Sequence, residues 1–382
     1  MSQTTIPILD QTPALAEGAR VMGICNSCRY CEGFCAVFPA MERRLTFTPD
    51  SMHFLANLCH NCGACYHACQ YAPPHAFALE LPQAMAAIRR ETYSSLAFPR
   101  ALGSAYQRQG LALSLAAVLG FFVIFVLATL SLGSIERLVS TPGPGLFYEI
   151  TPHALLVSLF GPVFLFSLVS MAISGWRFWR VLKSSATEAA FPLEEAVQTA
   201  KDVLTMRYLD GGGDGCPDRS DAPSPSRRIH HHLVFYGFML CLASTTVATL
   251  YHYILGLSAP YPLLSIPVVL GTVGGLLMVL GCAGLLATRS KRHPVLKPED
   301  QATMDVGFVA LLLLIALSGL LLLAVRTTAA MPLVHLFHLS TVLAFFVLMP
   351  YSKFVHGLYR GIALWWHNRE QRNPTRLKLS DA

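Results

Sequence analysis

Six long apolar runs occupy the chain after its first hundred residues. A helix needs about 20 consecutive apolar residues to cross the hydrocarbon core of a bilayer, and each run approaches or exceeds that length. The predicted spans are residues 111–132, 153–175, 231–255, 265–287, 305–325 and 334–356. The pattern therefore predicts a polytopic membrane protein whose spans form a six-helix transmembrane bundle.

The polar stretches divide the rest of the chain. We expect a polar, cysteine-rich domain in residues 1–105, the bundle in residues 106–360 with a cytoplasmic loop at 176–230, and a cytoplasmic tail in residues 361–382. The loop contains DGGGDGCPDRSDAPSPS, a composition typical of a flexible linker. GGGDG follows no predicted strand, and no Rossmann or P-loop pattern occurs elsewhere. Any flavin or nicotinamide chemistry is therefore expected on another polypeptide.

Composition and charge agree with a membrane protein. Of 382 residues, 53% are hydrophobic and 13% charged, against about a quarter charged in ordinary soluble proteins. Lys and Arg gather in residues 89–108, 177–183, 227–228, 289–292 and 353–372, whereas the opposite loops hold only Arg137 and Arg326. The positive-inside rule then places both termini in the cytoplasm. We expect no signal peptide, no nucleic-acid binding despite the net charge of +6, and a multi-pass protein of the bacterial inner membrane.

Eight of the eleven cysteines form two copies of one motif, C-x2-C-x2-C-x3-C, in CNSCRYCEGFC and CHNCGACYHAC. Four thiolates suit a cubane iron–sulfur cluster, and in two-cluster ferredoxins the last cysteine of each run serves the other cluster. This rule assigns Cys25, Cys28, Cys31 and Cys69 to one centre and Cys59, Cys62, Cys65 and Cys35 to a second. The motif predicts two [4Fe-4S] clusters. Structural zinc sites would not need the third and fourth evenly spaced cysteines, and disulfides conflict with a cytosolic domain.

The segment between the motifs indicates helices. In TPDSMHFLANL, Thr48 is an N-cap candidate and Pro49 occupies the first helical position. Alternating strand patterns are missing, so the strand-rich ferredoxin fold is the less favoured alternative. We predict an all-α protein, with an α-helical ferredoxin-like domain before the bundle.

Histidines near the span ends are candidate haem ligands, because ionisable residues inside membranes are costly and usually functional. His252 and His338 lie near the outer ends of the third and sixth spans, and His231 and His356 near their inner ends. Eighteen residues separate His338 from His356, about five helical turns, which would put both on one face. Bis-histidine ligation could then hold one or two b-type haems.

Other interpretations of these residues stay open. The histidines could be interfacial or hydrogen-bonded inside the bundle, and His153 and His335 compete as outer ligands. We expect ordinary thiols at the three cysteines outside the motifs and an interfacial aromatic belt near the C-terminus. The three cysteines are Cys216, Cys241 and Cys282, and the aromatic residues are Tyr359, Trp365 and Trp366.

The twin cysteine motifs precede six spans that include HHLVFYGFMLCLASTTVATLYHYILG and HLSTVLAFFVLMPYSKFVHG. This arrangement resembles the tricarballylate or citrate utilisation protein B family, which is also related to part of a cobalamin-biosynthesis fusion protein. The resemblance implies a membrane electron carrier that reoxidises the FAD of a partner dehydrogenase. It further implies iron–sulfur clusters, haem b and quinone as the electron acceptor. The segment 210–226 does not match the family pattern, which leaves the identity of the partner open.

Other classes of function remain alternatives. The chain would be an electron-transfer subunit and not the substrate dehydrogenase, since no residue looks able to bind a tricarboxylate. A tricarboxylate transporter would need charges in the spans or an inverted repeat with broken helices, and neither is apparent. Heterodisulfide-type reduction lacks the adjacent Cys-Cys pair. An iron–sulfur redox sensor would not need so many span histidines.

Overall fold

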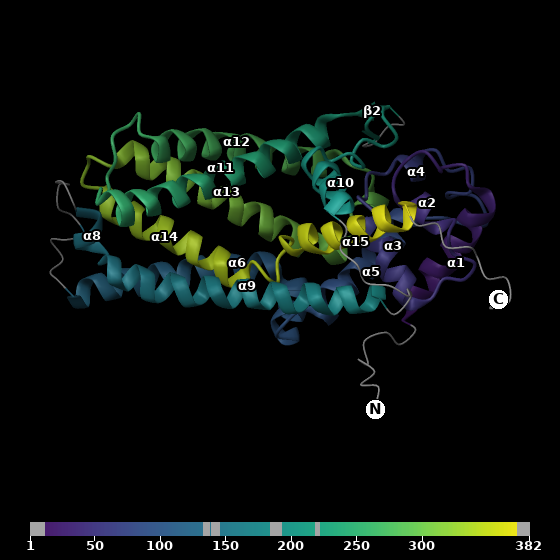
Figure 1. The fold of residues 1–382 in the computed structure, drawn as a ribbon, viewed down its shortest axis with the longest axis horizontal. Helices are drawn as coiled ribbons and strands as arrows, with labels where there is room; N and C mark the ends of the chain where they lie inside the picture. Colours follow the sequence, from purple (N-terminus) through teal and green to yellow (C-terminus); the bar gives the residue numbers. More distant parts are fainter. Residues whose placement is uncertain (1–11, 133–137, 139–145, 184–192, 218–221, 373–382) are drawn as a thin grey trace.

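The computed structural model describes residues 12–132, 138, 146–183, 193–217 and 222–372. These residues form a helical head and a bundle of long helices end to end along the longest axis of the molecule (Figure 1). The prediction of a mostly helical fold with six long apolar helices is confirmed. Residues 1–11, 133–137, 139–145, 184–192, 218–221 and 373–382, which include Arg137 and the end of the predicted tail, lie outside the described part.

Within the described residues, five helices build the head. They are α1 (Pro13–Cys28), α2 (Val37–Met41), α3 (Pro49–Leu58), α4 (Ala64–His67) and α5 (Leu81–Leu96). The predicted cap is confirmed, because Ser51 donates its backbone N–H to Thr48 Oγ1 at 3.3 Å and Pro49 begins α3. Thr12 caps α1 in the same way. The helices enclose an apolar core in which Met22, Met52 and Leu55 are fully buried.

In the described part of the chain, six helices are long and apolar enough to cross a membrane, and they form the bundle. They are α6 (Arg100–Leu132), α9 (His153–Lys183), α11 (Ser226–Leu255), α12 (Ile266–Lys291), α13 (Ala302–Val325) and α14 (Met331–Leu348). Large apolar side chains such as Leu119, Leu165 and Leu280 are about 60% exposed on their outer faces (60%, 62% and 61%). A contiguous apolar exterior of this kind is suited to lipid. A short helix, α8 (Leu146–Ile150), precedes α9.

The sixth span differs from the sequence expectation. The run 334–356 is not one helix, because α14 ends at Leu348 and α15 (Val355–Arg372) begins after a turn. Pro350 lies in this break, where its missing N–H and fixed φ interrupt a helix. His338 and His356 therefore sit on different helices, and the shared helix face expected from their spacing does not exist.

Helix α15 continues from the break toward the head (Figure 1), where it contacts α3 and α10 (Leu193–Leu204). Trp365 and Trp366 are 6% and 4% exposed, and both pack on Trp179 of α9. Tyr359 stacks on Tyr93 of α5 at 5.4 Å between ring centroids. The expected aromatic belt is thus wrong for these residues, since the protein core covers them.

The loop between α9 and α11 is structured over much of its length. It contains α10 (Leu193–Leu204) and a two-stranded pair, β1 (Cys216–Pro217) with β2 (Pro223–Ser224). Helix α10 turns polar residues inward, where Asn368 of α15 donates to Thr199 at 3.1 Å and to Asp202 at 3.0 Å. The expectation of a flexible linker is therefore wrong for residues 193–217, which pack on the head and on α15.

Candidate metal centres

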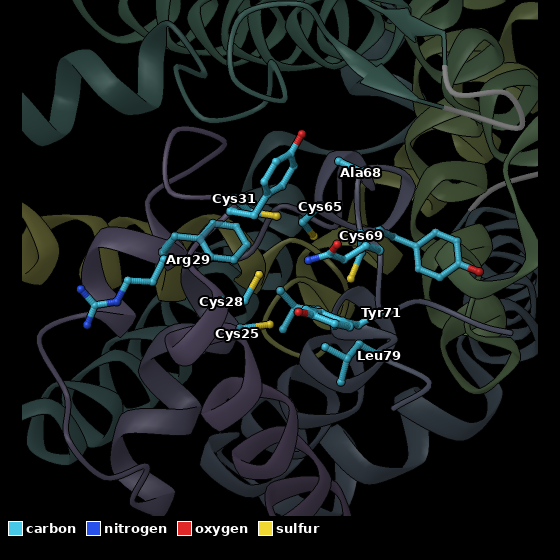
Figure 2. Close-up of a pocket in the computed structure, with 14 residues that line it drawn as sticks. Cys25, Cys28, Arg29, Cys31, Cys65, Ala68, Cys69, Tyr71 and Leu79 are labelled. Carbon is cyan, nitrogen blue, oxygen red and sulfur yellow. The ribbon is translucent and has the colours of Figure 1, made fainter. Parts of the chain in front are cut away.

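The first four-cysteine site lies at a pocket of about 230 Å³ in the head (Figure 2). Cys25 and Cys28 are in the last turns of α1, and Cys31 follows the turn in which Arg29 ends the helix with φ 56°. Cys69 joins them from the segment just after α4. The four thiols that the sequence assigns to one centre thus line the same pocket, which Cys65 also reaches.

The thiols of this site favour their protonated form before metal loading. Burial raises the pKa of Cys25 to about 12, with further contributions from Cys31, Cys69 and Cys28. The pKa of Cys31 is likewise raised to about 12, first by burial and then by Cys69. Ligation requires thiolates, so loading this site must release protons and weakens as the pH falls.

The second four-cysteine site is formed by Cys35, Cys59, Cys62 and Cys65. Cys59 and Cys62 are 8% and 7% exposed. The pKa of Cys35 is raised well above its ordinary range by burial, then by Cys62 and Cys59, and the same neighbours act on Cys65 after burial. The backbone N–H of Asn61 donates to Cys59 Sγ at 3.3 Å. The thiols assigned to the second centre therefore also lie together.

The donor sets fit iron–sulfur clusters better than single ions. In the described part of the chain, no three His, Cys, Asp or Glu side chains converge as they would on one metal ion. Four cysteines around a cubane stand farther apart, because each binds a different iron. Which cysteines ligate which cluster stays a prediction.

Four arginines surround the loop of the second site, and sequence reasoning assigned them only to membrane topology. Arg89 of α5 donates to the carbonyl of Cys59 at 3.0 Å, and Arg360 of α15 donates to the same oxygen at 2.7 Å. Arg227 of α11 donates to His60 O at 3.0 Å and to Asn61 O at 2.6 Å. Arg292, just after α12, donates to Asn61 O at 2.6 Å. We call Arg89, Arg227, Arg292 and Arg360 the arginine clamp.

A fifth cysteine lies beside the second site. Cys216 of β1 is 2% exposed and packs with Cys62 and Leu209. A hydrogen bond with Cys216 is the first of the causes that raise the pKa of Cys62. Gly212 in the same loop approaches Phe34 so closely that an added Cβ would lie 3.3 Å from its ring. From the sequence we expected an ordinary thiol at Cys216, because its spacing does not relate it to the two cysteine motifs.

The inner histidines face each other. The ring centroids of His231 and His356 are 5.9 Å apart, with an interplanar angle of 76°. A metal–imidazole bond is about 2.0 Å long, so two imidazoles on opposite sides of one iron place their centroids about 6 Å apart. His356 Nδ1 is hydrogen-bonded to the carbonyl of Lys353, which leaves Nε2 as the acceptor. His231 Nδ1 is buried without a hydrogen-bond partner among the described residues. The centroid distance of this pair is compatible with bis-histidine haem ligation, which stays a prediction.

The outer histidines are arranged differently. His252 stacks on His153 with centroids 4.2 Å apart and an angle of 23°, which leaves no room for iron between the rings. His338 Nδ1 lies 2.9 Å from Ser318 Oγ of α13. His335 packs on Phe147 at 4.9 Å. In the described part of the chain, no ring contact joins His252 to His338, so the predicted outer pair is not formed in this arrangement.

Together, the two cysteine sites and the apolar helices define a membrane protein with a ferredoxin-like domain at one end of its bundle. The family model of citrate utilization protein B matches residues 104–376, and that of its Fer4-like domain matches residues 18–95. The chain is 48% identical over 350 residues to "Citrate utilization protein B" of Escherichia coli, covering 91% of this chain and 90% of that protein. The chain therefore belongs to the citrate utilization protein B family.

The family places coarse limits on function. A Fer4-like domain indicates iron–sulfur clusters and, in general terms, electron transfer. No solved structure matches the chain significantly.

Proposed function

We propose that the protein reoxidises the FAD of a partner dehydrogenase that acts on tricarballylate or a citrate-like tricarboxylate. Electrons pass through two [4Fe-4S] clusters and haem b to the quinone pool. The clusters and the haem, when bound, would each accept and release one electron at a time, which splits the two-electron chemistry of a flavin into single steps, and two such electrons with two protons would reduce one quinone. The chain itself is an electron-transfer subunit.

The serial placement of the sites is the observation that supports this proposal most. The first site opens to the surface of the head, the second lies beneath it, and Cys65 is close to both. The buried side chain of His60, next to Cys59, is near His231 and Arg360, which help to lower its pKa after burial. The two thiol sets and the inner histidine pair thus form a chain of neighbouring sites from solvent to the bundle.

The first site is the docking position that we propose for the flavoprotein. Cys28 is exposed, and Tyr30 beside it is 70% exposed. An aromatic residue at an exposed redox site is suited to a protein partner, because aromatic residues are enriched in interfaces. A flavin brought to this surface would be closest to the first site, and the second is shielded by the arginine clamp and the loop that contains Cys216.

In this proposal, the histidines of the bundle bind the haem groups that take electrons from the head to quinone. His231 and His356 hold a haem near the cytoplasmic side, whereas an outer haem held by His252 and His338 would require His252 to move away from His153. The head and α15 lie at the same end of the bundle (Figure 1). The basic residues gather at that end as well, which supports a bacterial cytoplasmic membrane protein with cytoplasmic termini.

Cofactor analysis of the purified, detergent-solubilised protein tests the proposal. We expect about eight non-haem irons with matching sulfide, as two cubanes require, and an optical redox difference spectrum of a bis-histidine b-type haem. Cys62→Ser should lower the iron content and abolish reoxidation of the partner FAD, whereas Cys282→Ser, at a buried thiol of α12, should change neither. Normal FAD reoxidation by Cys62→Ser would refute the route.

Two other outcomes would replace the proposal. Clusters without haem would favour an iron–sulfur redox sensor. Tricarboxylate uptake by vesicles that contain this protein alone would favour a transporter.

A further inference from the structure

Two of the clamp arginines lie on the same helices as the inner histidines, and each is four residues from its histidine. On α11, Arg227 precedes His231 by one turn, and on α15, Arg360 follows His356 by one turn. Residues four apart lie on one face of a helix. Each helix therefore presents an arginine to the loop of the second site and a histidine to the facing helix, as the 5.9 Å spacing of the two rings shows.

We propose that the arginine clamp gives the cluster at the second four-cysteine site the higher reduction potential of the two. The second site is then the last electron carrier in the head before the inner histidine pair. This inference rests on the proposed function, because it concerns clusters held by these cysteines. It adds the relative reduction potentials of the two sites and the residues that set them. One electron moves from the first site to the second, oxidising the first and reducing the second, with no proton transfer required.

Electrostatics is the physical basis. A cluster held by four thiolates is an anion, and reduction adds one more negative charge. Fixed positive charges nearby stabilise the reduced form, and they do so more strongly in a dry, low-dielectric site than in water. Arg89 and Arg292 are 4% and 6% exposed, and the short bonds of all four clamp arginines to the loop carbonyls hold their charges in place.

The first site lacks a comparable arrangement in the described part of the chain. Arg29, which lines its pocket, is exposed and donates to the carbonyl of Asn26 at 3.0 Å. Arg20, near the head surface, forms an ion pair with Glu17 at 2.7 Å. Water screens exposed charges strongly, so these residues change the potential of a nearby cluster much less than buried arginines do.

A redox titration followed by electron paramagnetic resonance on the full-length protein tests the inference. Cys28→Ser and Cys62→Ser assign the signals, since each alters one cluster. We expect the second-site signal to appear at the higher potential. Arg227→Gln should lower the equilibrium constant for its reduction about tenfold, about 59 mV for a one-electron couple, and leave the first-site signal in place.

Three further variants separate charge from structure. Arg360→Gln tests the clamp from α15, so that a folding defect in one variant does not decide the result. Arg227→Lys keeps the charge and should retain most of the potential. Arg228→Gln is the matched control, because Arg228 is the next residue but is ion-paired with Asp210 at 3.5 Å and donates to Thr205 O, and among the described residues it has no hydrogen bond to the second-site loop.

The outcomes distinguish this inference from the function on which it rests. Wild-type protein with both clusters but a lower-potential second site would overturn the inference alone. Equal shifts of both signals in the glutamine variants, or no shift, would also overturn it. Wild-type protein without any iron–sulfur signal would overturn the proposed function and this inference together.

Discussion

The two ends of the bundle both carry histidines, but among the described residues the inner end alone holds two of them at a spacing compatible with binding one iron. There the rings of His231 and His356 face each other at 5.9 Å. At the outer end His252 stacks on His153 at 4.2 Å, and His338 turns toward Ser318. The inner end is also the one that the head grips through polar contacts. For the haem ligands that we propose, the comparison indicates that the inner pair is preorganised where the head docks and that the outer pair must rearrange to bind iron.

Loss of the inner pair should have the largest effect. We expect His356→Ala to remove the haem bound there and to block electron transfer from the head to quinone, because alanine leaves the iron without one axial ligand. Haem content and the rate of quinone reduction provide the measurement. His232→Ala is the control, since His232 stacks on Tyr236 and does not contact His356 in the described structure. Unchanged haem content in His356→Ala would remove the distinction between the two ends.

The ion pairs within the bundle at its inner end should contribute measurably to the free energy of unfolding. Asp305 of α13 pairs with Arg289 at 3.0 Å and with Lys353 at 2.9 Å, and these side chains are 24% exposed. Asp305→Asn should lower the free energy of unfolding by about 3 kcal/mol, because removing one partner leaves cations poorly compensated. Asp300→Asn breaks the exposed Arg90–Asp300 pair and should cost about 0.5 kcal/mol or less. Thermal unfolding in detergent compares the two, and equal losses would contradict this account.

Substitution at the outer end should have the smallest effect of the three. The hydroxyl of Ser318 fixes the ring orientation of His338, and loss of a hydrogen-bonding partner behind a metal-bound histidine typically costs about tenfold or more in affinity. We expect Ser318→Ala to weaken an outer haem about tenfold and to leave the inner haem intact. Haem titration of the apoprotein measures both affinities, with Ser131→Ala, at an exposed site, as the control. A loss confined to the inner haem would reverse our assignment of the two ends.

Much of the fold follows from local sequence signals. The six apolar runs predict six helices because length and hydrophobicity are properties of each segment alone. The cap at Thr48 and the start of α3 at Pro49 are likewise local. The structure extends several helices past the predicted ends, as in α9, which continues to Lys183. Charged residues continue a helix readily, although they cannot remain in the hydrocarbon.

Other features could not be predicted, because they depend on contacts between distant segments. The clamp residues Arg227 and Arg360 are 166 and 301 positions from their carbonyl partners Asn61 and Cys59. Cys216 reaches Cys62 only because the loop after α10 folds onto the head. The break before α15 did have a local signal, Pro350, which the apolar run obscured. The repeated spacing of Arg227 with His231 and His356 with Arg360 is visible in the sequence, but it has meaning only once both helices are seen to face one loop.

The break between α14 and α15 also has a mechanical consequence. Helices that span a bilayer tilt when its thickness changes. His356 is not part of such a helix, because α15 begins after the break. Trp365 and Trp366 of α15 pack in the same apolar core as the head helices. The same helix carries Arg360, which holds the loop of the second site. The separation between that loop and His356 is therefore set within one helix, so the electron-transfer distance that we propose should depend little on membrane thickness.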